Sequence, residues 1–505
     1  MTPPLVATDK RTQRNILIAM CTSLVAVVAS VSGLNVAQQA LARDLHASQS
    51  GVLWIINAYT LALAALLLPV GAIGDRWGRK PVLLTGLGVF GAANLVAAFA
   101  TSSEWMIICR SVAGVGAAMI MPVTLSVVTS SFPAEDRTKA IGVWAGFAGS
   151  GGMIGLFVSA FMVDQLSWRW TYALPVALVL IGGAMAMRHA PNSKEHAVHP
   201  FDTFGSVLAA LAIGGVVLGF QEGPELGWSS PIAVTALVTS GIAITMFVLW
   251  ERRHPAPLLD IASFRDRALA AGTVTLTIVF ALMFGIFLVL FPYFQAVVGW
   301  TALRSAAGML PMALVMMPTS AGAPRVAARF GARNTMLTGV VIFSLGLVTM
   351  AMNASVSGGY LSVLPGLLIL GFGMGLTMTP ATASITETLP QDKQGVASAL
   401  NDTSRELGGA IGVALLGSVL SSSFRTNMLH SLKGLPDALV RPASDGIANA
   451  FGVAAQAGDA GSTIIDAAKH AFVDAWVHSM WVGVAISAIA ALFLLFRGPK
   501  RVPVT

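Results

Sequence analysis

Charged residues are scarce in this sequence. Asp, Glu, Lys and Arg together make up 10% of the 505 residues, whereas hydrophobic residues make up 55%. A soluble domain carries about 25% charged residues. This shortage excludes a soluble globular protein and predicts an all-α polytopic membrane protein.

Cysteine is equally scarce. The two cysteines, Cys21 and Cys109, both fall inside apolar runs, which excludes a disulfide framework, a zinc site and a redox pair. The sequence also lacks a nucleophile–base pair, a cluster of metal ligands and a phosphate-binding loop. We therefore expect no enzymatic activity, no metal and no cofactor. We expect no cleavable signal peptide either, because the first apolar run is too long for one.

Long apolar runs are what the sequence has in abundance. A membrane span needs about 20 apolar residues, and by that length we predict fourteen transmembrane helices. They lie near 15–40, 50–72, 81–101, 105–129, 139–162, 169–188, 203–221, 231–250, 269–297, 303–325, 334–354, 361–386, 394–421 and 472–496.

The net charge of +7 follows this topology. With the N-terminus inside, most of the 30 Lys and Arg residues fall in cytoplasmic segments, as the positive-inside rule requires. We therefore place both termini in the cytoplasm. Because the basic excess is explained by topology, we expect no nucleic-acid partner.

The predicted helices divide into six, two and six. Residues 1–190 form an N-terminal six-helix half, and 191–268 hold two further helices with their cytoplasmic connectors. Residues 269–505 form a C-terminal half with a long external loop at 422–471. The segment 322–333 shares an Arg-x-Gly core with the corresponding loop of the first half. Two matching halves predict a substrate path at their interface, opened alternately to each side.

The loop between the second and third predicted helices combines glycines with charges in the pattern G-x-x-x-D-R-x-G-R-K, residues 71–80. Gly71 and Gly78 let two helix ends approach closely. The Asp75 carboxylate can accept hydrogen bonds at the N-terminus of a neighbouring helix, while Arg76 and Arg79 favour the cytoplasmic side. An ordinary positive-inside loop is the alternative, but this spacing favours a gate.

Further motifs follow in order along the chain. They are Trp54-Ile55-Ile56-Asn57-Ala58-Tyr59, Arg110-Ser111-Val112-Ala113-Gly114-Val115-Gly116, Ser167-Trp168-Arg169-Trp170, Phe201-Asp202 with Gly205, Pro257-Leu258-Leu259-Asp260 and 401–409. Together with the loop 71–80, they resemble the fourteen-helix drug–proton antiporters of the major facilitator superfamily over nearly the full length. The resemblance implies the major facilitator fold, with two six-helix halves plus two extra helices, and a cytoplasmic gate at 71–80.

The sequence departs from that family at several positions. Ser30 stands where family members usually carry an aspartate, and Asn57 and Met316 stand where some cation exporters place acids. The fifth-helix antiporter motif reads Gly155-Leu156-Phe157-Val158-Ser159-Ala160, without its proline and glycine pair. We therefore expect neutral, zwitterionic, anionic or lipid-like substrates rather than a dedicated dication pump.

Four charged residues lie inside predicted spans, Arg110, Asp402, Arg405 and Glu406. A charge in the bilayer interior is costly, so each is a functional candidate. Asp402 and Glu406 share one helix face, and two carboxylates at low dielectric do not both ionise cheaply, which predicts proton coupling.

Each cation in the set has an alternative role. Arg405 either holds Asp402 ionised and leaves Glu406 to titrate, or forms with Asp402 a pair that only fastens the helix. Arg110 either acts on a carboxylate of the cleft or binds carbonyl groups of the first two helices.

Amides and aromatic residues supply the substrate-binding candidates. A buried amide needs a partner and often faces a cavity, and thioethers suit promiscuous pockets. The candidates are Asn35, Gln38, Trp54, Asn57, Tyr59, Phe147, Phe287 and Met374. Packing or lipid contact is the alternative for each aromatic or Met.

The leading hypothesis is a proton-driven exporter of amphiphilic or lipid-like compounds, monomeric in the lipid of a bacterial cytoplasmic membrane. The first alternative is a lipid, siderophore or natural-product exporter on the same frame. A sensor or scaffold that no longer transports is the alternative of another class, supported only by the altered fifth-helix motif.

Overall fold

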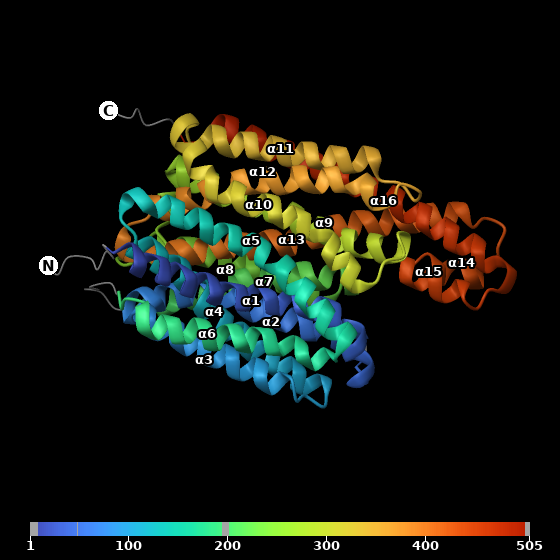
Figure 1. Cartoon of the computed structure of the whole chain (residues 1–505), viewed down its shortest axis with the longest axis horizontal. Helices are drawn as coiled ribbons and strands as arrows, with labels where there is room; N and C mark the ends of the chain where they lie inside the picture. The colour runs from blue at the N-terminus through green and yellow to red at the C-terminus, as the bar shows by residue number, and fades with distance from the viewer. Residues whose placement is uncertain (1–8, 48, 194–200, 500–505) are drawn as a thin grey trace.

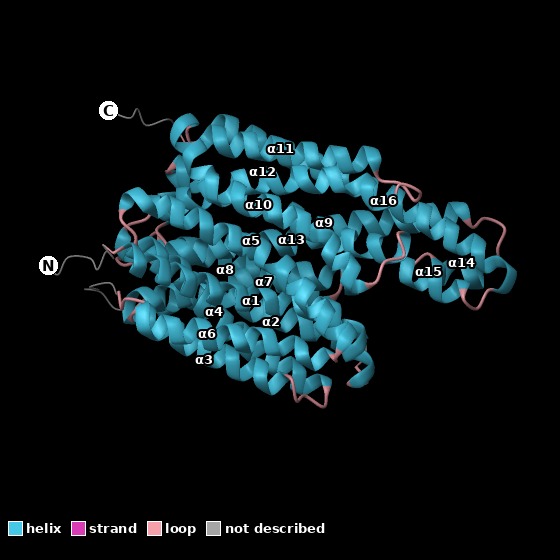
Figure 2. Ribbon diagram, viewed as in Figure 1, coloured by secondary structure: helices cyan, strands magenta, loops and turns pink. Residues whose placement is uncertain are grey.

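The computed structural model describes residues 9–47, 49–193 and 201–499. Within these ranges every regular element is a helix and no strand is present (Figure 2). Fourteen of the helices are long and apolar enough to cross a membrane. The predicted number of spans and the all-α class are confirmed for this part of the chain.

Six spans form the first bundle. They are α1 (Lys10–Asp44), α2 (Gln49–Trp77), α3 (Arg79–Ala97), α4 (Ser103–Ser131), α5 (Ala134–Gln165) and α6 (Ala173–His189), which follows the short 3-10 helix Trp168–Tyr172. The helix α4 packs on α2 and α3, and α1 packs on α5 and α6. Most of α4 is buried, so α4 lies at the centre of this bundle.

Two helices follow, α7 (Thr203–Leu226) and α8 (Pro231–Glu251), and they pack on each other. The helix α7 also contacts α2 and α13 (Gln394–Ser431), which belong to different bundles. It therefore lies along the seam between the two bundles, whereas α8 is largely exposed. A connector with the 3-10 helix Ile261–Arg265 leads from α8 into the last six spans.

The second bundle contains α9 (Arg267–Pro292), α10 (Ala302–Phe330), α11 (Ala332–Asn353), α12 (Gly359–Thr388), α13 and α16 (Gly461–Arg497). The helix α12 packs on α10 and α11, and α13 packs on α9 and α16. The two bundles meet through α2 with α13 and α5 with α10. Both ends of the chain lie at one end of the molecule (Figure 1).

The segment 422–471 was predicted to be a loop, but most of it is helical. The helix α13 continues to Ser431, the short helices α14 (Asp437–Ala443) and α15 (Ile447–Ala454) follow, and α16 begins at Gly461. These helices project beyond the bundles at the end opposite the termini (Figure 1). Hydropathy locates the apolar part of a helix, whereas the backbone hydrogen bonds of a helix continue into polar sequence.

Candidate functional site

The carboxylate of Asp75 joins the two bundles. Its Oδ1 accepts a hydrogen bond from the backbone N–H of Gly395 at 2.7 Å, and its Oδ2 accepts one from Val396 at 3.1 Å. These N–H groups belong to the first turn of α13, where they have no partner within the helix. The predicted contact between Asp75 and a helix N-terminus is therefore confirmed.

Arg79 completes this junction. Its guanidinium forms an ion pair with Asp75 at 2.7 Å, and both side chains are buried. The same guanidinium donates to the carbonyl oxygen of Gln391 at 3.3 Å, just before α13. The partial positive charge of the α13 N-terminus and the guanidinium of Arg79 both stabilise the Asp75 carboxylate. We call Asp75, Arg79 and the segment 391–396 the latch.

The glycines of the loop 71–80 serve two different purposes. A Cβ at Gly71 would lie 2.6 Å from the carbonyl oxygen of Gly395, so only glycine lets α2 and α13 approach this closely. Gly78 has a φ of 110°, which separates α2 from α3 and which other residues rarely adopt. Arg76 lies in the last turn of α2.

The latch lies at the end of the molecule that carries the termini. A further bond between the bundles, from the Thr138 hydroxyl to Glu387 at 3.0 Å, lies at the same end. Deeper in the bundles, the Ser320 hydroxyl donates to the Gly142 carbonyl oxygen at 3.0 Å. This end of the molecule is therefore closed in the structure.

A polar cluster lies on α13 about two turns beyond the latch. Arg405 pairs with Asp402 at 3.3 Å and donates to the Ala148 carbonyl oxygen on α5 at 3.3 Å. The Asn401 amide donates to the same Asp402 oxygen at 3.2 Å, and the Arg405 guanidinium lies 4.6 Å from the ring centroid of Phe280. Both alternatives for Arg405 require a contact with Asp402, and the structure shows this contact.

Some polar atoms of this cluster are unsatisfied. Asp402 Oδ2 and Arg405 Nε are buried without a hydrogen-bond partner among the described residues. An unpaired buried polar atom is costly, and for Asp402 Oδ2 a bound proton would lower that cost. The cluster is therefore not arranged as a fully satisfied structural clamp.

Glu406 lies one turn beyond Asp402 and is half-buried. Within the described chain no hydrogen bond to its carboxyl group is found, although the charges of Arg405 and Asp402 act on it. Its charge also reaches Tyr59 on α2, in the other bundle. The arrangement thus leaves Glu406 as the acidic group of this cluster without a direct partner.

Arg110 forms a separate buried group in the first bundle. It donates to the Ser30 hydroxyl at 3.1 Å and to the Ile55 carbonyl oxygen at 3.4 Å, and it lies 4.2 Å from the ring centroid of Tyr59. Its partners therefore include a carbonyl of the second helix, as the structural alternative required. No carboxylate among the described residues pairs with Arg110.

The substrate-binding candidates divide by their contacts. Tyr59 belongs to the Arg110 group, Asn57 contacts α7, and Met374 is fully buried in the packing of α12. The remaining side chains are half-buried, namely Gln38, Trp54, Phe147 and Phe287. Asn35 is on α1, but its side chain lies outside the part of the structure that is described.

Glu222 is the residue that the sequence analysis missed. Its segment was assigned to the loop between the seventh and eighth helices, whereas α7 continues through Pro224 to Leu226. Glu222 is buried and accepts a hydrogen bond from the Asn57 amide at 3.4 Å, and its neighbour Gln221 donates to Thr60 at 2.7 Å. The small residue Gly219, one turn earlier on the buried face of α7, was the available signal.

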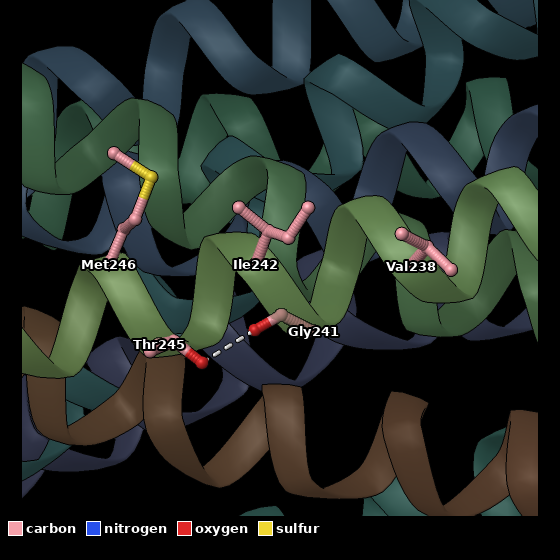
Figure 3. Close-up of a pocket in the computed structure, with 5 residues that line it drawn as sticks. All are labelled: Val238, Gly241, Ile242, Thr245 and Met246. Atoms are coloured by element: carbon pink, nitrogen blue, oxygen red, sulfur yellow. Dashed lines mark hydrogen bonds between the residues drawn. The ribbon is translucent and has the colours of Figure 1, made fainter.

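A shallow pocket lies on the outer face of α8 (Figure 3). It is lined by Val238, Gly241, Ile242, Thr245 and Met246, all of them exposed. The Thr245 hydroxyl donates to the Gly241 carbonyl oxygen of its own helix at 2.8 Å, so it offers little to a ligand. We assign no function to this pocket.

The two helical bundles, the latch between them and the buried charges define a membrane transport protein. The chain matches the Major Facilitator Superfamily over residues 18–413 and belongs to that family. Its fourteen spans fit the fourteen-helix drug–proton antiporter group.

Relatives and solved structures agree with this assignment. The chain is 28% identical to the multidrug resistance protein Stp of Mycobacterium tuberculosis, over 85% of this chain and 80% of that protein. It is 30% identical to the tetracenomycin C resistance and export protein of Streptomyces glaucescens, over 80% of this chain and 76% of that protein. The proton:xylose symporter XylE has a similar fold, with a TM-score of 0.62 at 12% identity, over 97% of this chain and 96% of that one.

Proposed function

We propose that this protein exports amphiphilic small molecules, including drugs, in exchange for protons. The names of its relatives support the export of drugs and antibiotics. The observation that carries the proposal is that one helix, α13, bears both the latch contacts and the acidic cluster. Export needs no cofactor and no enzymatic step, and protons supply the driving force.

In this proposal Glu406 takes up the proton. Its carboxyl group has no hydrogen-bond partner among the described residues and faces the charges of Asp402 and Arg405, so it is the group of the cluster least held in one protonation state. A change of charge there alters the electrostatic field on α13 and on Tyr59 across the interface. Because the latch grips the same helix at Gly395, a shift of α13 would release the closed end.

Glu222 extends the range of substrates in this proposal. Asn57 stands where some cation exporters place an acid on the second helix. Glu222 on α7 brings a carboxylate to this position by accepting a hydrogen bond from Asn57. A buried carboxylate without a cationic partner attracts a cation. We therefore infer that cationic amphiphiles are substrates along with neutral ones.

We place the protein as a monomer in a bacterial cytoplasmic membrane, surrounded by lipid, with both termini in the cytoplasm; the bacterial relatives support this location. A natural-product exporter is the second candidate, favoured by the similarity to the tetracenomycin C export protein.

Reconstitution tests the proposal directly. Purified protein in liposomes loaded with a fluorescent amphiphile should move the dye faster when a pH gradient is imposed, and a protonophore should abolish the increase. Dye movement equal to that of protein-free liposomes would contradict transport and would favour a sensor or scaffold.

A further inference from the structure

A second cluster of acids lies where α7 begins and α8 ends. Asp202 caps α7 by accepting a hydrogen bond from the Gly205 N–H at 2.8 Å. Its two carboxylate oxygens also accept the indole N–H of Trp250, at 3.0 and 3.2 Å. The side chain is buried and held in one position by these donors.

Glu251, the last residue of α8, lies beside Asp202. It is only 3% exposed, and its Oε2 accepts the backbone N–H of Leu259 at 3.2 Å. Its Oε1 is buried without a hydrogen-bond partner and lies, like Asp202 Oδ2, against Gly205, where a Cβ would collide with both oxygens. Because both oxygens lie within 2.4 Å of the same Cβ position, the unpartnered oxygen of Glu251 and Asp202 Oδ2 are no more than about 4.7 Å apart.

No Lys or Arg side chain forms an ion pair with Asp202 or Glu251 within the described chain. The imidazole Nδ1 of His254 lies 3.8 Å from Asp202, too far for a hydrogen bond, and accepts the N–H of Ala256 at 3.3 Å. Two adjacent buried carboxylates that lack a cation are stable only if a proton lies between them.

The other charged groups of the surrounding elements are directed elsewhere. Arg252 and Arg253 are exposed, Asp260 accepts the N–H of Ala262, and Lys393 donates to the carbonyl oxygen of Pro257. Asp75, at the end of α2, is paired with Arg79.

The acid pair is connected to the latch on both sides. The connector that Glu251 holds at Leu259 also receives the Lys393 ammonium group, at 3.1 Å from the Pro257 oxygen. Lys393 lies between Gln391 and Gly395, two of the residues of the second bundle that Asp75 and Arg79 bind. On the other side, Phe201 stacks on Trp77 with ring centroids 5.9 Å apart, next to Asp75.

We propose that Asp202 and Glu251 form a proton-binding site, in which one shared proton keeps the connector 252–260 folded against the latch. When that proton leaves, the two carboxylates repel each other and the connector loosens. Lys393 then loses its carbonyl partner, and the closed end of the protein opens more readily. The proton site differs from the acidic cluster of α13, and it does not depend on the proposed transport function.

Infrared difference spectroscopy of the full-length protein in detergent tests the site. When the pH is raised, the wild type should lose a protonated-carboxyl signal that Glu251→Gln lacks entirely. Asp202→Asn should move the pH at which this signal is lost, because the neighbouring carboxylate is gone. A wild-type signal identical to that of Glu251→Gln, or a midpoint unchanged in Asp202→Asn, would overturn the proposal.

Tryptic cleavage after Arg253 tests the coupling to the connector. Relative to a small peptide substrate at the same pH, cleavage of the wild type should rise roughly tenfold from acid to alkaline pH, as loss of one hydrogen bond predicts. Glu251→Gln, whose amide donates to Asp202 at every pH, should stay slow, and Asp260→Asn should behave as the wild type. Equal pH profiles for wild type and Glu251→Gln would contradict the coupling.

Discussion

At the scale of single residues, the proposed mechanism depends on carboxylates in different surroundings. Asp75 is held by two N–H groups and a guanidinium, and Asp402 by Arg405 and Asn401. Glu406 has no such partner among the described residues, and Glu222 has one amide. A carboxylate with donors on both oxygens, as in Asp75, is stabilised in its ionised form, whereas a carboxylate with an unpaired oxygen or few partners can exchange a proton or receive a cation.

The first prediction concerns Glu406. The substitution Glu406→Gln mimics its protonated form permanently, so substrate should still exchange down its own gradient while a pH gradient no longer drives uphill export. Counterflow and pH-driven uptake, measured on the same liposomes, separate these two activities. Uphill export by Glu406→Gln at the wild-type rate would remove Glu406 from the mechanism.

The second prediction concerns the Asp402–Arg405 pair. Asp402→Asn leaves the buried guanidinium of Arg405 without its counter-ion, which costs about 3–5 kcal/mol for a broken buried pair. We expect a lower melting temperature together with lower activity. Wild-type stability of Asp402→Asn would show that Arg405 is compensated by the carbonyl of Ala148 alone.

The third prediction concerns Glu222 and has a matched control on the same helix. Glu222→Gln should reduce export of a cationic dye about tenfold, as for the loss of one charge-assisted contact, and should spare a neutral dye. Glu225→Gln, which removes an exposed acid three residues away, should change neither. Equal losses for both dyes would indicate a structural role for Glu222.

At the scale of elements, α13 links the parts of the proposed mechanism. Its first turn binds Asp75, its third turn carries the acidic cluster, and its side packs against α2, α7 and α9. The glycine at position 71 allows α2 to lie against the start of this helix. Movement of α13 would therefore change the latch and the interface between the two bundles together.

The fourth prediction tests the latch as an element contact. Asp75→Asn keeps an acceptor for one N–H group of α13 but loses the ionic bonds, each worth about 1.5–3 kcal/mol. The protein should fold and insert normally, the closed end should open more often, and turnover should fall. Labelling of a cysteine introduced at Gln391 measures the opening. If labelling and turnover both equal those of the wild type, the loop 71–80 acts only as a topology signal.

The sequence predicted some of these elements and not others, for physical reasons. The contact of Asp75 with a helix N-terminus was predicted correctly because glycines beside a charged residue at a helix end have few other uses. The end of α13 was placed too early because its last turns are polar, and Glu222 was missed because Gly223 and Pro224 suggested a loop. A carbonyl contact of Arg110 was one of its two alternatives, but the particular partners Ser30 and Ile55 are distant in sequence, and local patterns do not identify them.

At the scale of the whole molecule, two bundles are closed at the end that carries the termini; α7 lies along their seam, and α8 packs on α7. The extra helices contribute Glu222 to the first bundle and the Asp202–Glu251 site to the latch. They are thus more than a spacer between the bundles.

The fifth prediction fixes the orientation of this assembly. A reporter inserted at 190–200 should be cytoplasmic, and one inserted at 430–465, in the region of α14 and α15, should be external. Reporters on the same side would mean that the number of spans between them is even rather than odd.

Proton-driven export can be tested on liposomes that start without a dye gradient. Liposomes containing the wild type or Glu406→Gln are given equal concentrations of a fluorescent amphiphile on both sides, and a pH gradient is then imposed. The account predicts that the wild type concentrates the dye on the acidic side, that a protonophore reverses this, and that Glu406→Gln leaves the two concentrations equal. Equal concentrations with the wild type, in liposomes where it still exchanges the dye, would contradict proton coupling.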